Sequence, residues 1–136
     1  MNLAAALYDT LSVDGTLAGM LTDYNGSPAI FTSHPAPGDA ELPYIVTAGE
    51  VSHLPFDTKT TRGRDLIRDV RCYAEADGSV VVVEAIAERV RDLLHRQALV
   101  ISGFDWIISN CSGPLAADEG DAYGRIISLS LKAQEV

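Results

Sequence analysis

Residues 125–132, RIISLSLK, decide the fold class of this chain. Apolar and polar side chains alternate along this stretch: Ile127, Leu129 and Leu131 on one side, Ser128, Ser130 and Lys132 on the other. Successive side chains of a strand point to opposite faces of a sheet. Such alternation is typical of an antiparallel strand with one face on a core. We therefore predict a sheet that is buried on one face.

Four earlier segments also have strand character, namely residues 29–32, 44–48, 66–73 and 104–110. They are rich in β-branched and aromatic residues, and they are separated by turn signals such as the NGSP motif of residues 25–28.

Residues 2–22 have the periodicity of a helix. Leu3, Leu7 and Leu11 recur at intervals of four, and the neighbouring alanines favour helix. Asp14 can cap a short second helical stretch.

Residues 79–96 carry conflicting signals. Val80 to Val83 are β-branched, which favours a strand. Ser79 is a good N-cap, however, and Val83, Ile86 and Val90 keep helical spacing. The length of the pattern favours a helix, so we predict one over 79–96.

The predicted fold class is therefore α+β, a mainly antiparallel β-sheet with two helices packed on one face, in the order α-β-β-β-α-β-β. The 136 residues are expected to form a single domain, 1–136. No internal repeat and no low-complexity tract interrupts it.

Charge narrows the possible partners. Asp and Glu number 19 against 10 Lys and Arg, a formal net charge of −9. Such a chain repels nucleic acid and anionic membrane surfaces, so sequence-specific DNA binding is not expected. No apolar run approaches the roughly 18 residues that a membrane span needs, and the N-terminus lacks the basic region of a secretory signal.

No motif predicts a metal, a cofactor or a catalytic nucleophile. The cysteines, Cys72 and Cys111, form no spacing motif and are expected to be reduced and partly buried. The histidines, His34, His53 and His95, lie far apart and are expected to be structural or solvated. A cation at His95 would be favourable, because it lies near a helix C-terminus.

Some of the carboxylates give weak support for a cation site or a catalytic role, as alternatives to a purely structural role. Asp118, Glu119 and Asp121 suggest a cation site, but most of the calcium-loop spacing is missing. A solvated hairpin turn fits better, and the same residues could contact a partner. Asp57 and Asp65 are expected to be exposed rather than catalytic, and Trp106 to belong to a core or an interface. We therefore do not expect an enzyme.

The segment at about 55–65, which we call the arm, is expected to be the protruding tip of a long hairpin. It gathers basic residues in an otherwise acidic chain. Its interface candidates are Asp57, Lys59, Thr60, Arg62 and Arg64. It is either a mobile solvated loop or a docking arm that reaches an acidic surface on a neighbouring subunit or another protein.

Four motifs follow one another in a recognisable order: LPYIV at 42–46, DTKT at 57–60, a Gly-Ser-led helix that ends in LHR at 94–96, and LVISG at 99–103. In this order and spacing, from about residue 3 to 133, the chain resembles the tail-terminator, or tail-completion, family of long-tailed phages, prophages and gene transfer agents. The valine run at 80–83 departs from the Ala- and Glu-rich helix usual in that family.

The resemblance implies a subunit of a ring, a hexamer, at the head-proximal end of a long non-contractile tail tube. Such a ring stops tube polymerisation and offers a surface for head joining, without catalysis or cofactor. Its partners would be further copies of itself, the tail tube protein and a head–tail connector or stopper. DNA would pass through without specific binding, and no membrane would be involved.

The same resemblance implies a virion protein that is assembled in the cytoplasm of a bacterial host, with the arm reaching along a neighbour or the tube. Two alternatives stay open: another head–tail connector, such as a stopper or adaptor, and a small ligand-binding or enzymatic domain with a site near Trp106.

Closure of a ring also requires particular surfaces on each subunit. A closed ring uses head-to-tail interfaces, so each subunit needs two different complementary patches. The basic arm and the acidic turn, residues 118–121, are candidates for such a pair. An acidic ring would also let DNA pass without sticking.

Overall fold

The computed structural model describes residues 1–33, 35–47 and 49–136. His34 and Ala48, the expected end of strand 44–48, lie outside the described residues. The helices are α1 (Leu3–Ser12), α2 (Gly15–Met20) and α3 (Val81–Leu94). The strands are β1 (Asp23–Tyr24), β2 (Ser27–Pro28), β3 (Ile30–Phe31), β4 (Tyr44–Val46), β5 (Glu50–Pro55), β6 (Gly63–Glu75), β7 (Phe104–Ala116) and β8 (Ala122–Glu135).

Three long strands, β6, β8 and β7, form the centre of a six-stranded sheet ordered β3-β4-β6-β8-β7, with β5 paired to the first part of β6. All pairs are antiparallel except β3 with β4. Leu66 lies opposite Leu131 and Val70 opposite Ile127, and all four side chains are buried. The alternation in residues 125–132 thus places its apolar side chains on the core, and the predicted α+β class is confirmed.

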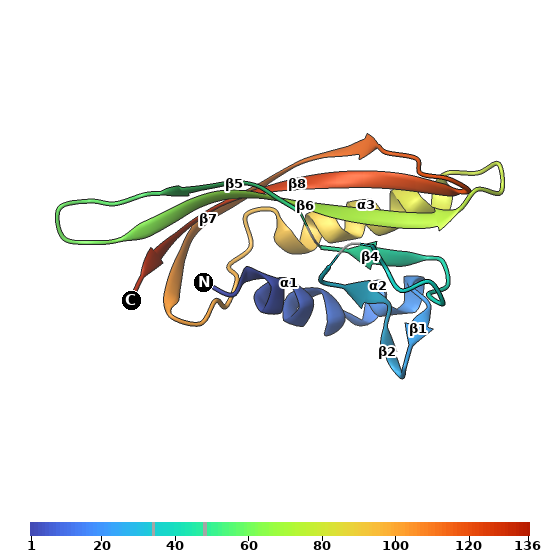
Figure 1. The fold of residues 1–136 in the computed structure, drawn as a ribbon, viewed down its shortest axis with the longest axis horizontal. Coiled ribbons are helices and arrows are strands. Elements are labelled where there is room, and N and C mark those ends of the chain that lie inside the picture. Colours follow the sequence, from blue (N-terminus) through green and yellow to red (C-terminus); the bar gives the residue numbers. More distant parts are fainter. Residues whose placement is uncertain (34, 48) are drawn as a thin grey trace.

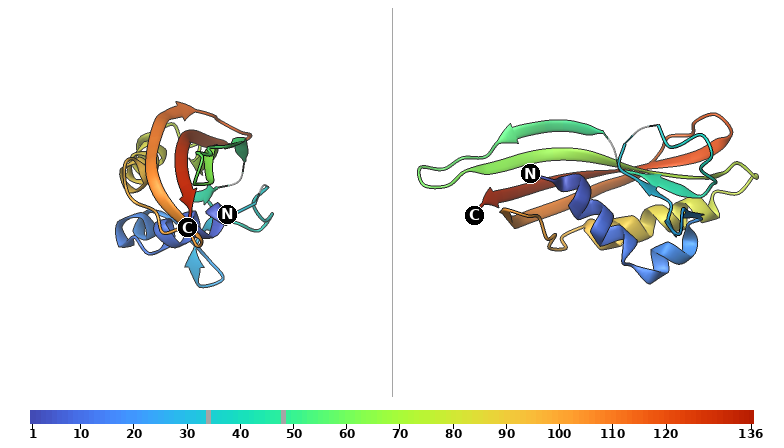
Figure 2. Two further views of the ribbon diagram at one scale, coloured as in Figure 1. Left: turned by 90° about the vertical axis from the view of Figure 1, so that its left-hand side faces the viewer. Right: turned by 60° about the horizontal axis from the view of Figure 1, so that its bottom comes forward.

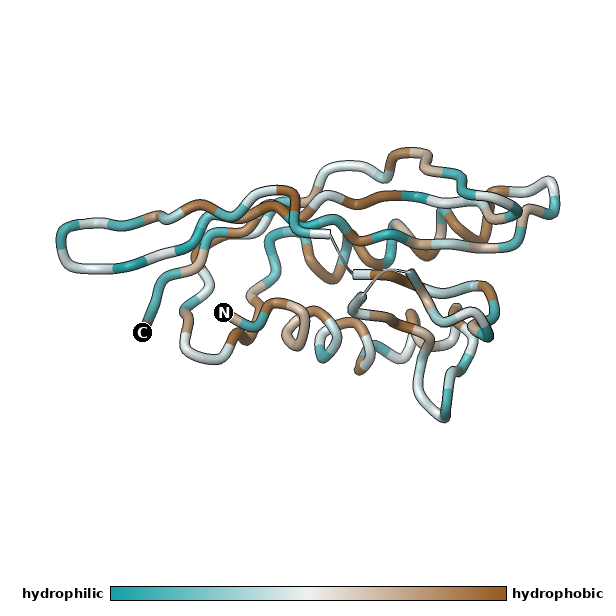
Figure 3. The backbone as a smooth tube through the Cα atoms, viewed as in Figure 1, coloured by the Kyte–Doolittle hydropathy of each residue, from teal (hydrophilic) through white to brown (hydrophobic). Residues whose placement is uncertain are grey.

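The helices cover one face of this sheet (Figures 1 and 2). Helix α3 packs against β6, β7 and β8 through Val83, Ile86, Val90 and Leu94, which are fully buried. Helix α1 buries Leu3, Leu7 and Leu11 against the same core. Figure 3 shows that hydrophobic residues recur along the helices and long strands, whereas the end of the β5–β6 hairpin is mainly hydrophilic.

Near the N-terminus the structure contains elements that the predicted order lacks, namely the helix α2 and the short strands β1 and β2. Residues 2–22 form two helices, because the Asp14 carboxylate caps α2 by accepting a hydrogen bond from Leu17 N at 2.8 Å, as expected. Asn25 and Gly26 of the NGSP motif form the turn between β1 and β2, and the last two residues of the motif form β2. Asn25 and Gly26 both have positive φ there, 52° and 85°, which is typical of a two-residue hairpin turn.

The boundaries predicted for residues 79–96 were wrong at both ends, although the helix itself is confirmed. Val80, not Ser79, occupies the cap position, and its carbonyl accepts the first helical hydrogen bond from Glu84 N at 2.9 Å. The Ser79 hydroxyl, one position outside, accepts from Val81 N at 3.4 Å. The helix ends at Leu94 because His95 has an extended conformation, with ψ of 114°, and Arg96 after it has a positive φ of 55°.

Tyr73 departs from the predicted half-exposed pattern of strand 66–73, since only 4% of it is exposed. Its ring joins a row of aromatic contacts, Tyr24 to Phe31 to Tyr44 to Tyr73, with centroids 5.3, 5.7 and 5.5 Å apart. These rings come from four strands, β1, β3, β4 and β6. This row therefore buries a residue that the local alternation assigned to the polar face.

Candidate functional site

The arm, residues 55–65, closes the hairpin of β5 and β6 and extends past the helices and the C-terminal end of β8 (Figure 1). Its turn is held by short-range hydrogen bonds. Phe56 N donates to Gly63 O at 2.9 Å, and Thr58 N donates to Thr61 O at 2.9 Å. The Asp57 carboxylate accepts from Gly63 N at 3.1 Å. Asp57 therefore shapes the arm from within.

The cations of the arm fall into two groups. Lys59 and Arg62 are exposed at its end, together with Thr60, and the described residues offer neither cation a side-chain hydrogen bond or ion pair. Arg64 lies at the base instead, half-buried, with its guanidinium 5.9 Å from the centroid of the Phe104 ring. Only Lys59 and Arg62 are thus presented outward without a local partner.

The acidic turn, residues 118–121, is exposed, as predicted, but two of its carboxylates have partners within the chain. Asp118 accepts from Gly124 N at 3.0 Å and from the guanidinium of Arg125 at 3.4 Å. Glu119 accepts from the Tyr73 hydroxyl at 2.8 Å. Burial, with this hydrogen bond as the next cause, raises the pKa of Tyr73. Two of the three carboxylates therefore stabilise the fold.

Asp121 is the remaining carboxylate of the acidic turn, and it is exposed. Among the described residues it has no side-chain hydrogen bond or ion pair. Asp121 is therefore the member of the turn that is left for outside contacts.

The structure places the arm and the acidic turn at opposite ends of the molecule. Gly63 pairs with Gln134 at one end of the β6–β8 ladder, and Glu75 pairs with Ala122 at the other. The 13 residues of β6 span about 40 Å at the usual rise of a strand. The two patches therefore cannot meet within one chain, and each is available to a different neighbour.

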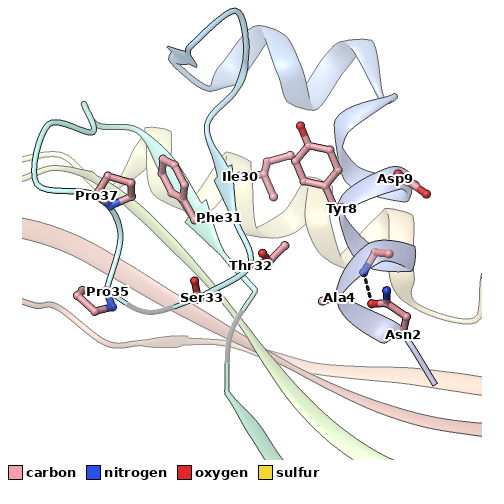
Figure 4. A pocket seen from close by; sticks show the side chains of 11 residues that line it. Asn2, Ala4, Tyr8, Asp9, Ile30, Phe31, Thr32, Ser33, Pro35 and Pro37 are labelled. Atoms are coloured by element: carbon pink, nitrogen blue, oxygen red, sulfur yellow. Dashed lines mark hydrogen bonds between the residues drawn. The ribbon is translucent and has the colours of Figure 1, made fainter.

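A hollow of about 630 Å³ lies between α1 and the segment after β3 (Figure 4). Its lining offers two ionisable side chains, Tyr8 and Asp9. The Asn2 side chain is already used, because it accepts from Ala5 N at 3.1 Å and so caps α1. The hydroxyls of Thr32 and Ser33 also line the hollow, but among the described residues neither makes a hydrogen bond to the Asp9 carboxylate that could activate it.

The remaining polar candidates have structural partners. Trp106 Nε1 donates to the Ser109 hydroxyl at 3.1 Å. His53 lies 3.3 Å from Glu50 on the exposed surface. The structural role expected for His95 is confirmed, because its Nδ1 accepts a hydrogen bond from Cys111 N at 2.9 Å.

Both cysteines are free and buried. Burial raises the pKa of Cys72 to about 12 and that of Cys111 to about 11, so neither is a ready nucleophile. The described part of the chain holds no group of three side chains suited to a metal ion. Over the same residues, no helix is long and apolar enough to cross a membrane.

Sequence reasoning missed a set of exposed apolar side chains. Leu54 and Phe56, at the arm, are 58% and 41% exposed, and Val81 and Val82, at the start of α3, are 71% and 49% exposed. The valines did leave a signal. β-branched residues weaken a helix, so a run of them in its first turn conflicts with the helical pattern of the segment.

Comparison with known proteins finds a solved structure with a similar fold. No protein-family model matches the chain, and no curated protein does. A chain of the solved structure described as "Virion of native gene transfer agent (GTA) particle" is similar, with a TM-score of 0.74 and 24% sequence identity. The likeness covers 98% of this chain and 93% of that chain. The two chains therefore share their fold over nearly their whole lengths.

Proposed function

We propose that this chain is a structural virion protein that terminates a tail tube. The observation that carries the proposal is the shared fold with a chain of a gene transfer agent virion, which leaves almost no part of either chain unmatched. The order of the sequence motifs at 42–46, 57–60, 94–96 and 99–103 points to the same group of proteins.

In this proposal the chain acts as one domain, 1–136, and its copies close into a ring, a hexamer. The ring caps the head-proximal end of a long non-contractile tube, stops its growth and presents a surface to the head–tail connector. It is assembled in the bacterial host cytoplasm and stays in the virion. A separation of about 40 Å between arm and acidic turn suits the head-to-tail contacts of a ring, which join two different patches.

Two further features support a protein that acts by shape. The net charge of −9 gives a ring that DNA can cross without binding to it. In the hollow between α1 and the segment after β3, no hydrogen bond joins a nucleophile to a base among the described residues.

A head–tail connector, such as a stopper or adaptor, is the second candidate. The same structural likeness supports it equally, because the matched structure is described as a whole virion particle and not as one part of it. Position in the particle separates the two roles.

The test is cryo-electron microscopy of particles that carry a small tag on this chain. The tag should decorate the junction where the tube ends. Decoration on the portal side of that junction would favour the connector, and particles without the tag would refute both.

A further inference from the structure

We propose that the arm of one copy binds the opposite end of a second copy, with Phe56 seated in the hollow beside Val82. This inference rests on the proposed function as a ring subunit, and it names the surface that receives the arm. The occupant is a second copy of this chain.

The arm presents its apolar side chains on one face. Leu54 lies opposite Asp65 in the β5–β6 ladder, and Phe56 follows two residues later, so both point to the sheet face that the helices leave open. The backbone of Phe56 is fixed by its bond to Gly63 O, and its ring lies 3.2 Å from where a Cβ on Gly63 would be. Phe56 is therefore held in place but remains 41% exposed.

The other end of the molecule offers a place for such a ring. A hollow of about 240 Å³ is lined by Leu42, Pro43, Ala74, Glu75, Asp77 and Val82. A cavity of about 150 Å³ already accommodates benzene, so a phenyl ring fits. Four of the six lining residues are apolar, and the other two, Glu75 and Asp77, are carboxylates. Val81 and Val82 extend the apolar surface outward.

The charges of the two ends are complementary. Residues 75–84 and 116–125, which meet at this end, carry six carboxylates and one cation, Arg125. Arg125 is already engaged, because it binds Glu84 and Asp118. On the arm, Lys59 and Arg62 are exposed three and six residues after Phe56. Lys132, which pairs with Asp65 at 3.9 Å, has its Nζ 5.8 Å from the Phe56 ring. Opposite charges around an apolar contact guide encounter and orientation, while the buried side chains supply most of the affinity.

The contact is necessarily head-to-tail. Because arm and hollow lie at opposite ends of the β6–β8 ladder, a copy that gives its arm to one neighbour still offers its own hollow to another. Repetition of this contact generates a ring when the rotation closes.

Cross-linking between two differently labelled copies tests the contact. One carries Leu54→Cys and the other Val81→Cys, both at exposed positions that leave Phe56 and Val82 in place. The native thiols are buried, so a short bis-maleimide reacts at the new ones. We expect the mixed dimer to form at least tenfold faster than in a control pair of Leu54→Cys with Val100→Cys, a 91% exposed position outside both surfaces.

A second variant tests the role of Phe56 itself. Adding Phe56→Ser to the Leu54→Cys copy should remove the tenfold advantage, whereas adding Val51→Ser, at another exposed position of β5, should leave it. Equal rates for the Val81→Cys and Val100→Cys pairs, or no effect of Phe56→Ser, would overturn the proposal.

The cross-linking result does not depend on whether this chain terminates tail tubes. Fast cross-linking by a protein that leaves tube growth unchanged would uphold the contact and refute the terminator. If the protein limits tube growth but its cross-linking is no faster than that of the control pair, the terminator role is upheld and the proposed contact is refuted.

Discussion

Arg89 in α3 donates two hydrogen bonds to the Asp14 carboxylate, from Nε to Oδ2 at 2.9 Å and from Nη2 to Oδ1 at 2.7 Å. The same carboxylate caps α2 through Leu17 N. A single side chain thus starts one helix and ties it to another that lies 75 residues away in the sequence. This pair fixes the two-helix N-terminal segment against the helix that covers the sheet.

Removal of the Asp14 carboxylate should therefore destabilise the fold. Asp14→Ala loses both the cap and the ion pair, and we expect a loss of about 1–3 kcal/mol in the free energy of unfolding. Asp14→Asn keeps a capping oxygen and should lose less. Urea unfolding followed by circular dichroism measures both, with the exposed Asp9→Asn as control. An unchanged midpoint for Asp14→Ala would show that the pair contributes nothing.

The same pair gives a pH dependence. The hydrogen bond from Arg89 lowers the pKa of Asp14 below its ordinary value of 3.8. A carboxyl whose pKa is lower in the folded state stabilises the fold above its unfolded pKa, and this contribution is lost as the pH falls through the folded pKa. The stability difference between the wild type and Asp14→Asn should thus be full at pH 7 and shrink below pH 3.8. A difference that grows on acidification would contradict it.

The thiols should be inert while the chain is folded. Because burial raises the pKa of Cys72 to about 12 and that of Cys111 to about 11, almost no thiolate is present at pH 8. Ellman's reagent should react with two thiols in urea and with neither in buffer over the same time. Rapid labelling of the folded protein would show that the β6 or β7 region opens.

The local pattern predicted the elements that depend on near neighbours. Alternation in 125–132 and the spacing of Val83, Ile86 and Val90 are properties of single segments, and both are confirmed. Strand β7 continues to Ala116, six residues past the predicted end. A register shift between Ser112 and Leu115 breaks the alternation there, and a pattern of period two does not reveal a strand across such a shift.

The candidate site was harder to predict because its decisive relations are between distant segments. Glu119 meets Tyr73 from 46 residues away, and no local pattern contains that contact. The separation of arm and acidic turn follows from the β6–β8 register alone. The exposure of Val81 and Val82 depends on which face of α3 the sheet covers, so the valine run by itself indicated only a conflict of propensities.

Charge reversal at the arm should block assembly and leave the fold intact. Lys59→Glu with Arg62→Glu removes two cations that have no local partner among the described residues, so the thermal midpoint should hold while particle yield falls. Arg64→Glu should in addition cost about 0.5–1 kcal/mol, because it loses the Phe104 contact. Lys59→Arg with Arg62→Lys is the matched control. If the variant with both charges reversed gives a normal yield of particles, Lys59 and Arg62 have no role in assembly.

The length distribution of tail tubes assembled in vitro, measured by electron microscopy with and without the purified protein, tests the proposed termination most directly. If the chain caps the tube, its addition during assembly should give short tubes with one closed end, and more of it should give shorter tubes. Tubes that grow to the same lengths at every concentration of this protein would contradict the proposal.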